Sequence, residues 1–348
     1  MGDFSVRPVR PAEYPEWDQL VSMCDQGTVF HQSVWPTAIA DAMNTRCSIQ
    51  GCFSDDRIIG GYVLYHSTIK GLFKAGNSTE AMSSFGGLIV NYERNASTQN
   101  REKKLNAVVD AVTRTLLNDG FDDIQFELSP PSYDIRPFIW NRWRHTIRYT
   151  YIISPEMVTL SKSARRHIRR AEDADIVVEP STDIDSYYTL YAETFMRQNL
   201  PPPMTREQME RVYRTIRESG MGEMWVARMP SGEWAAAEIQ LYDEKRSYAW
   251  SAASDIILRK NGASYLLRKR VFDYEAGKGV KESYLYTANT PQLAEFMIQF
   301  GPKLTPHFQV WRRQGCLHLI DKIISPLSNP GTDSGPVSTR VSFHVSRK

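Results

Sequence analysis

The fold is decided by residues 223–253, which read EMWVARMPSGEWAAAEIQLYDEKRSYAWSAA. Three apolar runs in it are typical of strands, at Glu223–Met229, Trp234–Tyr242 and Ser247–Ala253. Two clusters of turn-forming residues, PSG and DEKR, separate these runs. Because short turns join antiparallel neighbours, the stretch predicts a three-stranded antiparallel meander.

The chain around this meander predicts a helix and a crossover strand. A capping box at Thr205 begins a helix before the meander. Apolar spacing predicts another helix at Ala263–Ala276, and a strand follows at Glu282–Ala288. Thr290-Pro291 is typical of a helix start, and His307–Arg312 reads as a last strand. This order is typical of a mixed α/β sheet.

An earlier passage repeats the same order of elements. Strands are expected at Ser48–Phe53 and Ile58–Tyr65, and a helix at Arg101–Asn118. The alternating residues of Asp123–Leu128 then predict the crossover strand. The fold class is therefore α/β, with mixed sheets in two copies.

Two copies predict two domains. We place an N-terminal domain at 1–155 and a C-terminal domain at 156–316, with the boundary near Pro155. The residues 317–348 form a C-terminal tail, rich in Ser, Pro and Gly, for which no packed structure is expected.

Composition excludes several classes of protein. The chain has 348 residues, of which 41% are hydrophobic and 24% charged, as in globular proteins. No apolar run approaches the roughly 20 residues that a membrane helix needs, and the N-terminus does not resemble a signal peptide. We therefore expect a cytoplasmic protein without a transmembrane segment. Four cysteines and seven histidines lack the spacing of a zinc site, so no metal is expected. A net charge of +2 gives no reason to expect a DNA partner.

Six segments carry a resemblance to a known family. The sequence resembles the Fem-type and BioF-type acyltransferase-like branch of the GNAT superfamily in the order and spacing of these segments. They are TVFHQSVW (28–35), SSFGGL (83–88), SARRHIRRA (163–171), TFMRQNLP (194–201), YAWSAAS (248–254) and NGASYLL (261–267).

The resemblance implies two tandem GNAT-like domains and the transfer of an acyl or aminoacyl group, often to an amine. Donors in such families include acyl-CoA and aminoacyl-tRNA. Acceptors include cell-wall precursor peptides and polysaccharide amines. The partners expected here are therefore a small-molecule or lipid-linked amine acceptor, with tRNA as a second possibility.

A loop before the predicted helix at 263–276 is a candidate anion site. Backbone N–H groups and the helix dipole at such a position bind phosphates, here the pyrophosphate of CoA or a tRNA phosphate. GNAT enzymes carry a Gln/Arg-x-x-Gly-x-Gly/Ala loop at this point, and Ser264 departs from that pattern. An ordinary turn with a glycine remains the alternative. The predicted cofactor-binding residues are Arg259, Lys260, Asn261, Gly262, Ala263 and Ser264.

A basic stripe is the second candidate site. On a helix its members fall at i, i+3, i+4, i+7 and i+8, which places them on one face. Five like charges repel one another, and an anionic ligand would relieve that repulsion. Ion pairs with acids such as Asp122 and Asp123 are the alternative; a membrane-surface role is less favoured because the stripe is short. The stripe consists of Lys162, Arg165, Arg166, Arg169 and Arg170.

Acyl transfer to an amine needs polarisation of the carbonyl and movement of protons. In GNAT folds a backbone N–H polarises the carbonyl where two strands separate; here the resemblance places them at 247–253 and 282–288. Glu238, among apolar neighbours, is a candidate general base because burial would raise its pKa. Tyr286 is a candidate acid for the leaving group, or a core residue. Trp250 and Asn289 are expected to line the substrate cleft.

The first domain lacks an obvious phosphate loop. Its glycine-containing, basic segment Lys70–Gly76 reads better as a loop between strands. We therefore expect the first domain to hold the acceptor and the second to bind the donor.

The sequence thus predicts an N-acyltransferase that transfers an acyl group from acyl-CoA to an amine of a sugar, peptide or cell-envelope precursor. One alternative is an aminoacyl-tRNA-dependent Fem-type transferase, which the arginine stripe and the altered glycine loop favour. The other is a non-catalytic module that binds an anionic glycan or lipid head group.

Overall fold

The computed structural model describes residues 4–317 except 198, 287 and 316. The predicted tail at 317–348 lies outside the described residues apart from Leu317.

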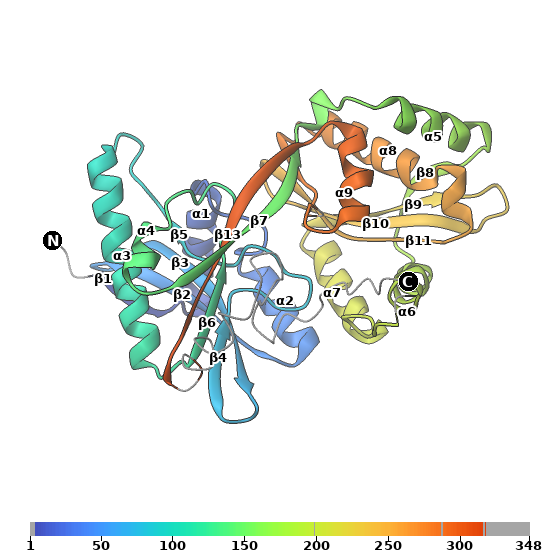
Figure 1. The fold of residues 1–348 in the computed structure, drawn as a ribbon. Coiled ribbons are helices and arrows are strands. Elements are labelled where there is room, and N and C mark those ends of the chain that lie inside the picture. The colour runs from blue at the N-terminus through green and yellow to red at the C-terminus, as the bar shows by residue number, and fades with distance from the viewer. Residues whose placement is uncertain (1–3, 198, 287, 316, 318–348) are drawn as a thin grey trace, which may run out of the picture. The chain divides into compact units, whose positions relative to one another are not determined.

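The chain forms two compact units, each of which is described by itself (Figure 1). Of the described residues, unit 1 contains those up to Ile147 and those from His307 to Leu317, and unit 2 contains those from Arg148 to Pro306. The domain boundary near Pro155 stays a prediction, and the division into these units runs through strands β7 (Arg144–Ile153) and β13 (Lys303–Arg313). The reason is hydrogen bonding: the second half of β7 pairs within unit 2, and the second half of β13 pairs within unit 1.

Unit 1 has the strand order β1-β2-β3-β4-β6-β13, with β5 beside β3. All these neighbours are antiparallel except β4 and β6, which are parallel. The strands are β1 (Phe4–Pro8), β2 (Arg46–Ser54), β3 (Arg57–Ile69), β4 (Phe73–Asn77), β5 (Ile89–Val90) and β6 (Asp123–Glu127). The helices are α1 (Tyr14–Met23), α2 (Val34–Met43), α3 (Thr98–Asn118) and α4 (Arg136–Trp140).

Unit 2 has the strand order β7-β12-β11-β10-β9-β8. All neighbours are antiparallel except β11 and β12, which are parallel. The strands are β8 (Val177–Ser181), β9 (Gly222–Arg228), β10 (Trp234–Tyr242), β11 (Arg246–Ser254) and β12 (Glu282–Tyr284). The helices are α5 (Lys162–Asp173), α6 (Ile184–Met196), α7 (Arg206–Glu218), α8 (Ala263–Gly277) and α9 (Pro291–Met297).

The two sheets share one plan. In each, four antiparallel strands are followed by a helix, a parallel crossover strand and a final antiparallel strand. The crossover helices are α3 in unit 1 and α8 in unit 2. The predicted α/β class with a duplicated mixed sheet is confirmed. The final strands are exchanged along the chain: β13 completes unit 1, and β7 completes unit 2.

Most predicted elements are present within a few residues of their expected bounds. The capping box at Thr205 is confirmed, since its hydroxyl accepts from the Gln208 N–H and the Gln208 side chain bonds back. The strand expected at Glu282–Ala288 is wrong beyond Tyr284. The chain there turns at Tyr286, whose φ is +51°, and leaves its neighbour β11.

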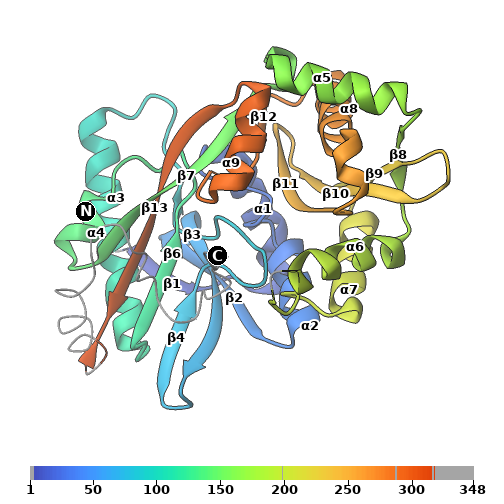
Figure 2. The same ribbon diagram turned by 45° about the vertical axis from the view of Figure 1, so that its right-hand side comes forward.

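Each unit buries its helices' apolar stripes against its sheet. In unit 1, Val108, Val112 and Leu116 of α3 pack on Ile124 and Phe126 of β6. In unit 2, apolar residues of α5 and α8 share one cluster with β9 and β10, and these two helices lie side by side in both views (Figure 2).

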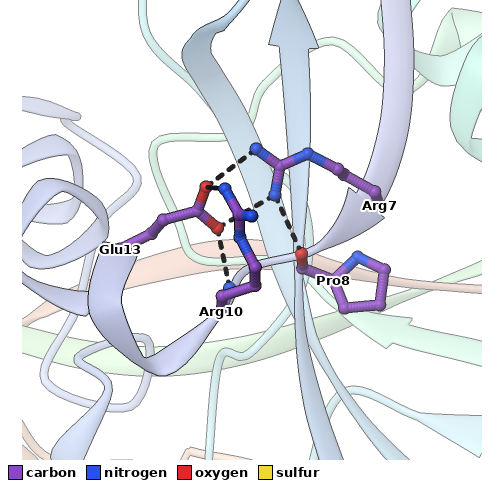
Figure 3. Close-up of polar contacts among 4 residues, drawn as sticks. All are labelled: Arg7, Pro8, Arg10 and Glu13. Carbon is purple, nitrogen blue, oxygen red and sulfur yellow. Dashed lines mark hydrogen bonds and ion pairs between the residues drawn. The ribbon is translucent and has the colours of Figure 1, made fainter.

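The first turn of unit 1 is fixed by Glu13. Its two carboxylate oxygens accept from the two terminal nitrogens of Arg7 at 2.9 Å, and one of them also accepts from Arg10 at 2.7 Å (Figure 3). These bonds, with the Arg7 ones the strongest, lower the pKa of Glu13 well below its usual range. Through Glu13, both arginines therefore link β1 to the start of α1.

Candidate functional site

The sequence-predicted site residues all lie in unit 2. The structure places them in four places: on α5, in the loop before α8 with the first turn of that helix, on β10 and β11, and just after β12. The side chain of Arg259 is outside the described part of the chain. No described group of three or more His, Cys, Asp or Glu side chains is placed to hold a metal ion.

The parallel strands β11 and β12 separate after three residue pairs. The last pair joins Tyr248 to Tyr284, whereas β11 continues to Ser254. Beyond this pair the chain bonds to β7 instead, and the Leu285 N–H donates to the Tyr151 carbonyl at 2.9 Å. The strands expected to separate therefore do so.

Side chains from β7 hold the chain beyond β12. The Tyr286 N–H donates to Thr150 Oγ1 at 3.2 Å. The Asn289 amide accepts from the Tyr149 N–H at 3.0 Å and donates to its carbonyl at 2.7 Å. Asn289, predicted to contact substrate, thus bonds to β7 as a neighbouring strand would.

Trp250 lies at a β-bulge of β11, just beyond its last pair with β12. Ile239 pairs with Ser251 and Gln240 with Ala249, so Trp250 is the extra residue of β11. Its side chain is 6% exposed, which makes it part of the core more than a lining residue. A bulge turns the neighbouring backbone groups out of the regular ladder, here at the edge where β12 leaves.

The N-terminus of α8 fits an anion. Gly262 has a φ of +87°, and a Cβ there would lie 2.0 Å from the His167 carbonyl oxygen, so only glycine allows α5 this close. The N–H groups of Ala263 and Ser264 have no acceptor among the described residues. Together with the helix dipole, these donors suit phosphate oxygens.

The basic stripe forms as predicted on α5. Its packing face is buried, with Ala164, Ile168 and Ala171 against the core. The cations are exposed, and none forms an ion pair with a described residue; they are Lys162, Arg165, Arg166, Arg169 and Arg170. The alternative partners have other bonds: Asp122 accepts from the Lys74 N–H, and Asp123 pairs with Arg313.

The stripe and the α8 terminus are neighbours within unit 2. Arg170 donates to the Lys260 carbonyl at 3.2 Å. His167 stacks on Tyr265 of α8, with ring centroids 4.6 Å apart. Burial lowers the pKa of His167, and the charges of Arg170 and Arg166 lower it further. We call the exposed cations of α5, Lys260 and the two N–H groups of α8 the anion-binding face.

Glu238 lies in the core between β10 and α8. It is 4% exposed and forms an ion pair of 2.6 Å with Arg268, which is 1% exposed. Gln240 donates a further bond of 3.3 Å to it. Burial raises the pKa of Glu238, as expected, while Arg268 opposes that rise. Arg268 thus holds the Glu238 carboxylate in the interior of unit 2.

A second buried acid adjoins this pair. Glu275 of α8 is fully buried, and burial raises its pKa to about 7 against the opposing charge of Arg268. Arg268 and Glu275 were not predicted as site residues from the sequence, although the sequence carries a signal for them. Arg268 and Glu275 are seven residues apart on the apolar face of a predicted helix, where charged side chains are rare.

Tyr286 keeps its hydroxyl proton at neutral pH, because burial raises its pKa well above the usual range. Its ring lies 6.3 Å from that of Tyr248, nearly parallel to it. The tyrosine therefore stands beside the last pair of β11 and β12, where a proton donor was predicted.

The comparisons with known proteins agree with this geometry. Residues 160–291 match the family model described as the acetyltransferase (GNAT) domain. Among curated proteins no sequence matches significantly. No helix in the described ranges is long and apolar enough to span a bilayer.

Several solved structures share the fold over nearly the whole chain. The crystal structure of FemX has a TM-score of 0.71 at 12% identity, covering 92% of this chain and 99% of FemX. L-PGS from Bacillus licheniformis has a TM-score of 0.55 at 11% identity, covering 92% and 98%. A tandem GNAT protein from the clavulanic acid biosynthesis pathway has 0.52 at 12%, covering 90% and 99%. The family match and these folds confirm the predicted resemblance to Fem-type tandem GNAT proteins.

Proposed function

Because residues 160–291 carry a GNAT acetyltransferase domain, we propose that this protein is an N-acyltransferase. It transfers an acyl group from acyl-CoA to an amine of a sugar, peptide or cell-envelope precursor. Two observations in unit 2 carry the proposal: β11 and β12 separate after three residue pairs, and the Ala263 and Ser264 N–H groups of α8 have no acceptor among the described residues. One ligand with an acyl arm and a pyrophosphate would use both features.

The donor's phosphates are proposed to bind the anion-binding face. The Ala263 and Ser264 N–H groups supply donors, and the stripe supplies cations without competing acids. The acyl arm is proposed to lie where β11 continues beyond its last pair with β12.

The reaction then needs few groups. The acceptor nitrogen attacks the thioester carbon, the C–N bond forms and the C–S bond breaks. A backbone N–H of β11 near the Trp250 bulge is proposed to polarise the carbonyl oxygen. Tyr286 is proposed to give its proton to the departing sulfur and to recover one from the attacking nitrogen, which loses a proton as the amide forms. Glu238, our predicted base, is better suited to holding Arg268.

An aminoacyl-tRNA donor is the second candidate, and the length of the stripe favours it. Five exposed cations along α5 exceed what one pyrophosphate requires. A tRNA backbone offers a row of phosphates that would neutralise them.

Thermal unfolding with acetyl-CoA, longer acyl-CoAs and free CoA tests the donor. A ligand at about 100 times its Kd adds roughly 2.7 kcal/mol to the free energy of unfolding. A clear shift with CoA species supports the acyltransferase. No shift with any of them contradicts it and favours tRNA or a binding module without a donor.

Charge variants show whether the stripe takes part. Arg166→Ala and Arg169→Ala should each weaken CoA binding about tenfold, because each removes one charge-assisted bond. Both side chains are exposed without ion pairs, so the melting temperature should not fall. Arg214→Ala, an exposed arginine of α7, is the matched control and should bind normally. A fall in the melting temperature without loss of binding would show a structural stripe.

A further inference from the structure

A carboxylate and an imidazole meet in unit 1, on the neighbouring strands β6 and β13. The strands β6 and β13 are antiparallel neighbours, and Gln309 stands directly opposite Glu127. His307 precedes Gln309 by two residues, so both side chains lie on the same face of the sheet as Glu127.

Both oxygens of Glu127 are engaged by this face. His307 Nε2 lies 2.8 Å from Oε1, and Gln309 Nε2 donates to Oε2 at 2.9 Å. An ionised carboxylate only accepts hydrogen bonds, so the imidazole carries its hydrogen on Nε2. In the neutral ring with hydrogen on Nε2, the other ring nitrogen, Nδ1, is a lone-pair acceptor.

His307 Nδ1 is buried and has no hydrogen-bond partner among the described residues. The residue as a whole is 5% exposed. A buried acceptor without a donor costs stability, so a native protein rarely keeps one unless something binds there.

The imidazole is also held by a loop that the sequence singled out. Phe85, from the SSFGGL segment, meets the His307 ring edge to face at 5.1 Å. The same loop donates from the Gly87 N–H to the Glu127 carbonyl at 3.0 Å. The TVFHQSVW segment anchors it, because Thr28 donates to the Phe85 carbonyl at 3.2 Å. The SSFGGL segment therefore contacts this pair directly, and the TVFHQSVW segment holds the SSFGGL loop.

We propose that Glu127 and His307 form a proton-accepting site for the acceptor's primary amine in unit 1. Nδ1 takes one proton from the bound ammonium, which leaves the neutral amine that acyl transfer requires and an imidazolium beside Glu127. Gln309 is a positioning residue that holds the carboxylate. This inference rests on the proposed function and names the chemistry of its acceptor side.

His307→Gln separates this role from a structural one. The glutamine amide can still donate to Glu127 but cannot accept a proton. With acetyl-CoA and glucosamine, ethanolamine or a lysine peptide as acceptor, kcat/KM at neutral pH should fall about 10²- to 10⁴-fold. The loss should shrink as pH rises, because solvent then deprotonates the amine. His145→Gln, an exposed histidine of β7, should change neither rate nor melting temperature.

Two results would overturn the proposal. One is a His307→Gln rate within threefold of wild type. The other is an equal loss at every pH together with a clear fall in melting temperature, which would make the pair structural.

Nitrogen NMR of the imidazole gives a readout that does not depend on acyl transfer. We expect hydrogen on Nε2 and an unprotonated Nδ1 that shifts when glucosamine or ethanolamine is added. Hydrogen on Nδ1, or no shift with any amine, contradicts the site. A wild type that consumes no CoA thioester would refute the proposed function, while this spectrum still decides whether the pair accepts a proton.

Discussion

Each unit holds a carboxylate against a cation or a titratable base, and the two pairs differ in what they can do. In unit 1 Glu127 faces His307 at 2.8 Å, and in unit 2 Glu238 faces Arg268 at 2.6 Å. A guanidinium keeps its proton at any pH a protein meets, whereas an imidazole exchanges one near neutrality. The distances are alike, so the two pairs differ in whether the partner of the carboxylate can exchange a proton.

The surroundings sharpen this difference. Glu127 is bonded by His307 and Gln309, whereas the charge of Arg268 acts on two acids, Glu238 and Glu275. Two carboxylates around one guanidinium leave an excess negative charge in the interior. The raised pKa of Glu275 favours the protonated, neutral form of its carboxyl group, which reduces this buried negative charge.

The largest expected effect comes from removing the shared cation. Arg268→Met leaves two buried acids without a counter-charge and should lower the free energy of unfolding by about 3–5 kcal/mol. Urea unfolding of the full chain measures it. Arg270→Met is the matched control on the same helix; its ion pair with Glu172 is exposed, so roughly 0.5 kcal/mol or less is expected. A loss below about 1 kcal/mol for Arg268→Met would show that the pair contributes little.

The next effect is a dependence of stability on pH. Glu275 has a pKa of about 7 when folded, above its unfolded value of 4.5, so the folded state holds the extra proton between these values. The contribution is present in full below pH 4.5 and is lost as pH rises through 7, about 3 kcal/mol in all. Urea midpoints from pH 5 to 8 measure this pH dependence. The charged groups that act on Glu275 are Arg268 and Glu238. Glu275→Gln should remove this slope, and an unchanged slope would assign it to another group.

The smallest effect concerns the donor beside the imidazole. Gln309→Ala removes one of the two bonds to Glu127 and should cost about 1 kcal/mol. His307 should keep its hydrogen on Nε2, and kcat should fall several-fold with KM unchanged, since the carboxylate would be less well oriented. If Gln309→Ala has a normal kcat although the NMR signal of His307 Nδ1 has shifted, Gln309 is not a positioning residue.

Local patterns predicted much of the fold. The meander, the crossover helix and the capping box follow from alternation, apolar spacing and turn residues, all of which act within a few positions. The bounds of β10 agree with the expectation at both ends. The end of β12 could not be predicted in this way, because it depends on whether Leu285 bonds to β7 or to β11.

The sites were less predictable because their partners are distant in the chain. The loop before α8 and the basic stripe are contiguous segments, and the sequence showed both. Glu238 was singled out without Arg268, which lies 30 residues later and decides its role. Glu127 and His307 are 180 residues apart, and no local period joins them.

The exchange of β7 and β13 has a consequence for synthesis. On a ribosome adding roughly 5–20 residues per second, about 10–40 s pass between the emergence of β6 and that of β13. Every strand of unit 2 leaves the ribosome earlier than β13, so its sheet can close first. Unit 1, although it begins the chain, waits with an open edge at β6 and an incomplete proton site. The histidine arrives with β13, so the nascent protein gains its proposed base only after every described strand of unit 2 has been made.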